Sequence, residues 1–167
     1  MGTEEIRPRL YLETTVVSYL AAWPSRDLIV AAHQEITHRW WRTSRLRFDL
    51  FASEPVIREA SGGDPEAAAR RLLFLERVPL LELKPEVFSL ASQLVEAIQL
   101  PPQAREDSLH LAVAAVHEIP FLLTWNCRHL ANARLRDRIE AACSIAGYRA
   151  PAISTPEELL DEAGYVD

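Results

Sequence analysis

The segment EDSLHLAVAAVHEIPFLLTWN, residues 106–126, carries the pattern that decides the fold. Its first half repeats apolar side chains at helical spacing, as at Leu109 and Val113, which predicts a helix with one buried face. Its second half contains a short apolar run at residues 121–125, directly after Pro120, and such a run is typical of a buried strand. A helix that leads into a strand apolar on both faces predicts an α/β fold built on parallel strands.

The same alternation continues outward from this segment in both directions. Strands are expected at residues 9–12, 48–52, 80–83 and 121–125, with a last edge strand near Ile153. Helices are expected at residues 14–22, 28–45, 67–78, 86–99, 106–118 and 133–146, with a short helix that ends at Gly62 and a helical turn at residues 156–163. We therefore predict a mainly parallel sheet with helices on both sides, and such sheets bind ligands at the carboxyl ends of their strands.

The composition predicts one folded domain, which we expect to span residues 1–167. Hydrophobic residues make up 49% of the chain and charged residues 25%, the balance of a globular protein. The most apolar stretch, residues 109–125, is interrupted by histidines, a glutamate and a proline, so no membrane span is expected. The N-terminal residues lack a secretory pattern. Cys127 and Cys143 are expected to be small core residues in the reducing cytoplasm.

The net charge of -6 argues against a passive nucleic-acid binder, because such proteins are usually basic. It is compatible with an enzyme whose acidic residues hold a cation, because a bound cation reverses the local field. Almost all basic residues are arginines, with Lys84 as the one lysine. The planar guanidinium group suits bidentate contacts with phosphate.

Acidic or amide side chains stand near the ends of several predicted strands. Glu13 follows the first strand, and Glu59 lies on the helix after the second. Asp107 begins the helix before the fourth strand, and Asn126 follows that strand. Carboxylates in one pocket repel each other unless a hard cation such as Mg²⁺ or Mn²⁺ binds them, and such a cation promotes phosphodiester hydrolysis. The alternative interpretation is that these are surface carboxylates or helix-start charges.

Three local motifs favour the first interpretation. They are YLETTVVSYL (residues 11–20), EPVIREAS (residues 54–61) and the segment at residues 106–126. In order and spacing they resemble the motifs of PIN-domain ribonucleases, most closely the VapC-type toxins of bacterial toxin–antitoxin pairs, over about residues 10–130. The resemblance implies a PIN-like three-layer α/β/α sandwich with four to five short strands. It also implies an endoribonuclease that requires Mg²⁺ or Mn²⁺, forms homodimers and is inhibited by an antitoxin protein.

By position in these motifs, the resemblance assigns catalysis to Glu13, Glu59 and Asp107, with Glu13 and Asp107 as metal ligands. Thr124 matches a hydrogen-bond partner of a site carboxylate, and Asn126 falls where a fourth aspartate often lies. The chain therefore departs from the family twice. Glutamate replaces the first aspartate and adds one methylene, and asparagine supplies no negative charge. These departures favour one metal ion over two and leave open whether activity is reduced or lost.

Further candidates flank these acids. Thr14 and Thr15 stand at a predicted helix N-terminus, where they can contact phosphate or orient water, and they serve equally well as helix caps. Arg128 and His129 come directly after the last motif and are placed to touch an RNA substrate. Glu106 is expected to be a solvated charge in the first turn of its helix.

Other patterns have structural interpretations. Arginines at residues 39–47 surround Trp40 and Trp41, a mixture that can track an RNA backbone. The same residues are also expected in an amphipathic helix with Trp40 in the core, and we favour this second interpretation. His110 and His117 share a predicted helix face without a third ligand nearby in sequence, so we interpret both as structural.

The leading hypothesis is a metal-dependent endoribonuclease. The second is a PIN-like module with weak or no catalysis that binds RNA or a protein partner, suggested by Glu13 and Asn126. A phosphatase is the third, but no Asp-x-Asp motif follows the first strand and no glycine-rich phosphate loop occurs.

Overall fold

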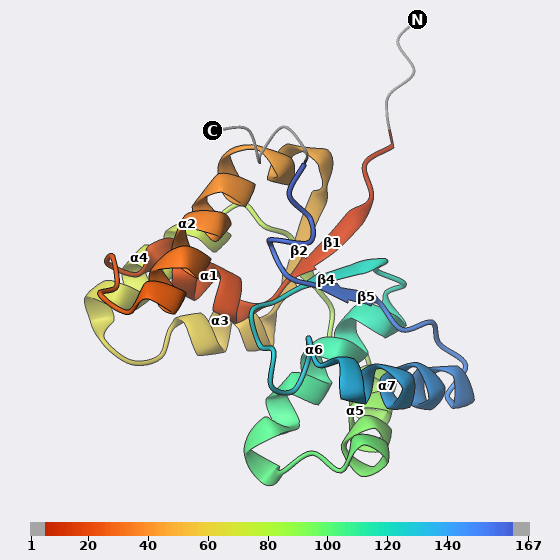
Figure 1. Ribbon diagram of the computed structural model, residues 1–167. Helices are drawn as coiled ribbons and strands as arrows, with labels where there is room; N and C mark the ends of the chain where they lie inside the picture. The colour runs from red at the N-terminus through yellow and green to blue at the C-terminus, as the bar shows by residue number, and fades with distance from the viewer. Residues whose placement is uncertain (1–5, 162–167) are drawn as a thin grey trace, which may run out of the picture.

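Five parallel strands form the central sheet of the protein, and the computed structural model describes residues 6–161 (Figure 1). In spatial order the strands are β3 (Leu80–Leu81), β2 (Asp49–Ser53), β1 (Arg9–Leu12), β4 (Phe121–Leu123) and β5 (Ala152–Ser154). The register places Tyr11 of β1 level with Phe51 on one side and Leu122 on the other. The predicted parallel sheet is confirmed, with β1 at its centre.

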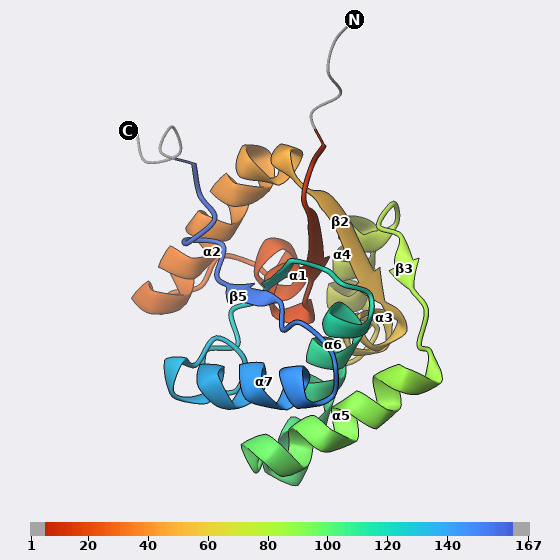
Figure 2. The same ribbon diagram turned by 90° about the vertical axis from the view of Figure 1, so that its right-hand side faces the viewer.

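Helices cover both faces of this sheet. On one face lie α1 (Thr14–Ala21), α2 (Leu28–Arg42), α3 (Glu54–Ala60) and α4 (Pro65–Leu75). On the other lie α5 (Pro85–Ile98), α6 (Arg105–Val116) and α7 (Ala133–Ile145), and Figure 2 shows α5 and α7 side by side. Two short 3₁₀ helices, η1 (Ser44–Arg47) and η2 (Pro102–Ala104), connect the other elements. The predicted three-layer α/β/α sandwich is therefore confirmed.

The strand order reverses direction at β1. From β1 the chain moves outward to β2 and β3, then returns across the sheet to β4 and continues to β5. Right-handed crossovers that run in opposite directions along a sheet place their helices on opposite faces. The crevice outside the carboxyl ends of β1 and β4 is therefore the topological switch point, where α/β sheets bind ligands.

The core explains why β1 and α6 carry polar side chains into the interior. Leu10, Tyr11 and Leu12 have no exposed surface, as expected for a strand covered on both faces. Helix α6 packs between α5 and the sheet, and it buries Ser108 and every residue from 110 to 115. Asp107 and His110 therefore lie on the covered side of α6, whereas Arg105 and Glu106 are exposed.

Several boundaries differ from the sequence-based expectation. The α-helix expected at residues 28–45 ends at Arg42, because the Thr43 hydroxyl bonds the Arg39 carbonyl at 2.8 Å and the chain turns into η1. Strand β3 is two residues long. The expected turn at residues 156–163 lies partly outside the described residues.

The interpretation of Trp40 as a core residue is confirmed, because it has no exposed surface. The arginines near it lie around η1, which leads into β2, and so belong to the amino ends of the strands. The expectation for the cysteines is half wrong: Cys143 is buried and Cys127 is exposed. Between residues 6 and 161, no helix has the length and apolar character needed to cross a bilayer.

Candidate active site

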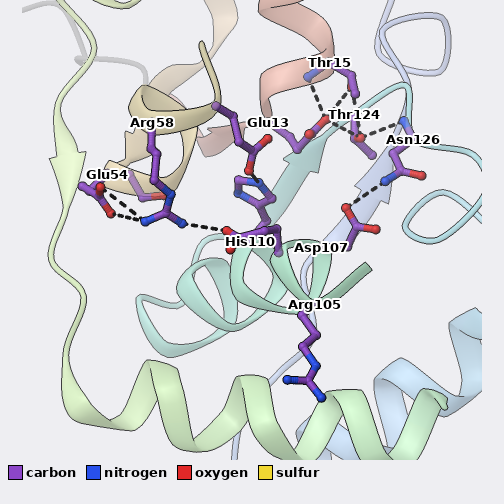
Figure 3. Close-up of polar contacts among 12 residues, drawn as sticks. Glu13, Thr15, Glu54, Arg58, Arg105, Asp107, His110, Thr124 and Asn126 are labelled. Carbon is purple, nitrogen blue, oxygen red and sulfur yellow. Dashed lines mark hydrogen bonds and ion pairs between the residues drawn. The ribbon is translucent and has the colours of Figure 1, made fainter. Parts of the chain in front are cut away.

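The predicted acids meet at the carboxyl ends of β1 and β4 (Figure 3). Glu13 directly follows β1 and is the N-cap residue of α1. Its backbone N–H donates to the Leu123 carbonyl at 3.1 Å, which ties the end of β1 to the end of β4. Glu13 is only 3% exposed, so its carboxylate is buried at the ends of these strands.

One oxygen of Glu13 is held by a group of donors. Its Oε2 atom accepts the Thr15 N–H at 3.0 Å, the Thr15 hydroxyl, and the Thr124 hydroxyl at 2.7 Å. The threonines are fixed in turn, because Thr15 Oγ1 accepts the Trp125 N–H at 2.8 Å and Thr124 Oγ1 accepts the Asn126 N–H at 2.9 Å. Oε1 makes no hydrogen bond within the described part of the chain. The contacts orient Glu13 and leave Oε1 open.

Glu59 is oriented by a histidine from the opposite face of the sheet. His110 Nε2 lies 2.7 Å from Glu59 Oε1, and His110 Nδ1 lies 2.7 Å from the Tyr11 hydroxyl. That hydroxyl also contacts Ser53 Oγ at 2.6 Å. The ring is 1% exposed, and both of its nitrogens are engaged. His110 therefore fixes Glu59 and leaves the second carboxylate oxygen, Oε2, without a hydrogen bond among residues 6–161.

The donor set around these residues fits a hard divalent cation. One ligand atom each from Glu13, Glu59 and His110 lie within 4.8 Å of one another. The buried Thr14 hydroxyl makes no hydrogen bond of normal geometry among the described residues, but it lies near enough to Glu59 to lower the pKa of that carboxylate. Two carboxylates beside this hydroxyl offer the oxygen ligands that Mg²⁺ and Mn²⁺ prefer. His110 is the weakest ligand candidate of the three, because both ring nitrogens already have partners.

Asp107 belongs to a second group beside the first. Its Oδ1 atom accepts the Asn126 side-chain amide at 2.9 Å, and its Oδ2 atom lies 2.8 Å from His129 Nδ1. The Asn126 side-chain oxygen accepts the His129 backbone N–H at 3.1 Å. Figure 3 shows Asp107 and Asn126 facing each other next to His110.

Burial dominates the protonation of two carboxyl groups. It raises the pKa of Glu13, and the nearby His110 charge with the Thr15 and Thr124 hydrogen bonds offsets this only in part. Burial also raises the pKa of Asp107, against the opposing effects of His129 and Asn126. Charged carboxylates at both positions are therefore costly without a nearby positive charge.

The contact between Glu59 and His110 outweighs burial in setting the pKa values of both groups. Burial opposes the charge of Glu59, but the hydrogen bond and charge of His110, followed by the Thr14 hydroxyl, lower its pKa overall. Burial likewise opposes the His110 imidazolium, but the Glu59 hydrogen bond and the charges of Glu13, Glu59 and Asp107 raise its pKa. The carboxylates around His110 thus favour its charged form.

The arginines near the site are at its rim. Arg58 pairs with Glu106 at 2.7 Å and with Glu54 at 3.2 Å. All three side chains are at least half exposed, so these ion pairs contribute little stability. Arg105 points away from the carboxylates in Figure 3, and Arg128 is exposed at the surface.

Sequence reasoning identified the acids and missed how they are grouped. The structure brings Glu13 together with Glu59, Thr14 and Thr124, as shown by the contacts above. It places Asp107 with Asn126 instead of in the group within 4.8 Å.

The two histidines were missed as site residues. His110 was interpreted as structural, and His129 was considered only as a substrate contact. The spacing in the sequence was the signal that could have identified them. His110 comes three residues after Asp107, and His129 comes three residues after Asn126, so each histidine is close in sequence to a predicted site residue.

Comparison of the chain with protein-family models, with curated proteins and with solved structures returned no match. The functional argument therefore rests on the site itself.

Proposed function

We propose that this protein is a metal-dependent endoribonuclease that hydrolyses RNA phosphodiester bonds. The observation that carries the proposal is the pairing of Glu13 and Glu59 at the switch point, each with one oxygen held and one open. Carboxylates oriented in this way repel each other, and a cation bound between them removes the repulsion. Phosphodiester hydrolysis is the reaction class that such an arrangement serves best.

In this proposal Glu13 and Glu59 hold one Mg²⁺ or Mn²⁺ ion. When bound, the cation supplies a Lewis acid that lowers the pKa of water and stabilises charge on the phosphate. Thr15 and Thr124 keep Glu13 in place, and His110 keeps Glu59 in place.

The choice of RNA, and of a toxin role, rests on the resemblance of the three motifs to VapC-type PIN-domain toxins. In line with that resemblance, we include an antitoxin protein as an inhibitor, a homodimer as the working form and the cytoplasm as the compartment. These parts are separable from the chemistry. A nuclease without an antitoxin would keep the same roles for Glu13 and Glu59.

The test is cleavage of end-labelled RNA by purified protein with Mg²⁺ or Mn²⁺, with DNA of the same sequence in parallel. We expect RNA cleavage that requires the cation and is lost in Glu13→Gln and Glu59→Gln. Glu96→Gln is the matched control, because Glu96 is exposed on α5. Cleavage that persists in the two site variants contradicts the proposal and points to a contaminating nuclease.

A second candidate function is favoured by one observation. The raised pKa of His110 favours an imidazolium among the carboxylates without any metal, and that charge can offset part of their repulsion in place of a cation. The protein would then be a binding module for RNA or a protein partner. Calorimetric titration with Mn²⁺ separates the two functions, because absence of binding at millimolar metal supports the module.

A further inference from the structure

The proposed function leaves one hydrogen-bonded group of the site unused. Asp107, Asn126 and His129 contact one another in a closed set: Asn126 to Asp107 at 2.9 Å, Asp107 to the His129 ring at 2.8 Å, and the His129 backbone to Asn126 at 3.1 Å. Both the main chain and the ring of His129 are therefore fixed by residues of the site. This is more support than a histidine in a surface loop requires for folding.

The contact with Asp107 determines which ring nitrogen is available. A carboxylate only accepts hydrogen bonds, so Nδ1 of His129 is the donor. Nε2 makes no hydrogen bond among the described residues, and the side chain is 21% exposed. A carboxylate on Nδ1 and an open Nε2 is the arrangement in which an imidazole transfers protons at Nε2.

The Asp107–His129 pair stands beside the glutamate pair and not within it. The Thr124 hydroxyl joins the two groups, because it donates to Glu13 at 2.7 Å and accepts the Asn126 N–H at 2.9 Å. A proton donor to the leaving oxygen requires a phosphate bound between the groups, with the glutamates on one side and the imidazole on the other. Attacking and leaving oxygens lie on opposite sides of phosphorus in an in-line displacement.

We infer that His129 is the general acid of the reaction and delivers a proton from Nε2 to the leaving ribose oxygen. The inference rests on the proposed function. Water oxygen forms a bond to phosphorus as the bond between phosphorus and the leaving oxygen breaks. The electron pair of that bond stays on the leaving oxygen, which takes the His129 proton. Water releases one proton to solvent, and solvent returns one to His129.

Asn126 is a positioning residue in this scheme. Its amide group donates to Asp107 and its carbonyl oxygen accepts from the His129 backbone, so it holds both members of the pair. An aspartate cannot make the first of these contacts, because an ionised carboxylate has no donor. The asparagine in place of a fourth aspartate therefore adapts the site to proton transfer.

The experiment compares two substrates whose leaving groups differ in their need for a proton. One substrate is a short RNA, whose leaving group is a ribose alkoxide that needs a proton. The other is uridine 3′-(4-nitrophenyl phosphate), whose leaving group is 4-nitrophenolate, which is stable without a proton. For His129→Asn we expect RNA cleavage to fall by about 10²–10⁴-fold and release of nitrophenolate to change little. Asparagine retains an N–H donor for Asp107 and lacks Nε2, so this variant separates proton transfer from support of the fold.

His38→Ala is the matched control, because His38 is a partly exposed histidine on α2. The rates of RNA cleavage and of nitrophenolate release by this variant are expected to equal those of the wild type. Equal loss of both rates in a folded His129→Asn variant overturns the general-acid role, and so does unchanged RNA cleavage. A wild-type protein that cleaves neither substrate with Mn²⁺ overturns the proposed function and this inference with it.

Nitrogen NMR of the metal-free protein supplies a readout that does not depend on activity. For neutral His129 we expect the tautomer with the proton on Nδ1, because Asp107 accepts from that atom. The tautomer with the proton on Nε2 overturns the inference even if activity assays are prevented by poor folding of a variant.

Discussion

The Nε2 atom of His110 lies 2.7 Å from Oε1 of Glu59, so a histidine on α6 orients a carboxylate on α3. The two residues are 51 positions apart in the chain, and they meet because α3 packs against α6 at the edge of the sheet. The contact couples metal binding, protonation and stability, because the same imidazole balances the carboxylates when no cation is bound.

The first prediction concerns stabilisation by metal. At free Mn²⁺ of 100 times Kd, binding stabilises the native state by about 2.7 kcal/mol, which raises the Tm of a domain of this size by about 5–10 °C. Glu13→Gln and Glu59→Gln should each remove this shift, measured by differential scanning fluorimetry. Glu96→Gln should retain it. A full shift in both site variants would mean that the cation binds elsewhere.

The second prediction is a pH dependence of the metal-free protein. The folded-state pKa of His110 is raised above its ordinary value of 6.5, so its stabilising contribution is complete below pH 6.5 and is lost as the pH rises through the folded value. The free energy of unfolding should therefore fall as the pH increases from 6.5 to 8.5. The raised pKa values of Glu13 and Asp107 also lower the free energy of unfolding with rising pH, but that loss begins at their ordinary values of 4.5 and 3.8.

Urea denaturation at a series of pH values measures this dependence. His110→Gln should flatten the slope above pH 6.5, and His38→Gln should leave it as in the wild type. A slope that survives in His110→Gln would assign the dependence to another group.

The third prediction compares two buried threonines in the same site. Thr124→Val removes a donor to Glu13 and an acceptor for Asn126, which should destabilise the protein by about 1–3 kcal/mol. Thr14→Val should cost less stability, because the Thr14 hydroxyl makes no hydrogen bond of normal geometry among residues 6–161 and acts on Glu59 only as a neighbour that lowers its pKa. It should nevertheless weaken Mn²⁺ binding, measured by calorimetry. Equal destabilisation by both substitutions would contradict the assigned contacts.

The fourth prediction concerns the asparagine at residue 126. Asn126→Asp replaces a donor 2.9 Å from Asp107 with a second carboxylate, which should destabilise the metal-free protein by about 1–3 kcal/mol at neutral pH. Acid should restore part of this loss, because a shared proton relieves the repulsion. Asn132→Asp is the matched control: aspartate keeps the α7 cap made by the side-chain oxygen and loses only the exposed amide contact with the Arg128 carbonyl, so a smaller loss of stability is expected. Similar unfolding midpoints for the two variants would show that Asn126 does not hold Asp107.

Several parts of this structure were predictable because their causes are local. The strand at Arg9–Leu12 was predicted with the observed bounds, since four residues between a proline and a glutamate leave little freedom. Helix α6 was predicted to within two residues from apolar spacing. The position of Glu13 directly after β1 followed from these elements, whereas β4 ends at Leu123, before the predicted residue 125, so Asn126 lies in the loop beyond it. The end of α2 was missed because the Thr43 side chain competes for a helix carbonyl, and that competition leaves no clear pattern in sequence.

By itself, the sequence determined the alternation of strands and helices, the parallel sheet and the set of acids near one of its edges. Those features depend on hydrophobic spacing and on turn residues, which act over a few positions. Only the tertiary structure decided that Glu59 pairs with His110 and that Asp107 pairs with His129. The physical reason is that a hydrogen bond requires the donor and acceptor atoms to be placed to within a few tenths of an ångström. The positions of these atoms are set by how α3, α6 and the chain after β4 pack on the sheet.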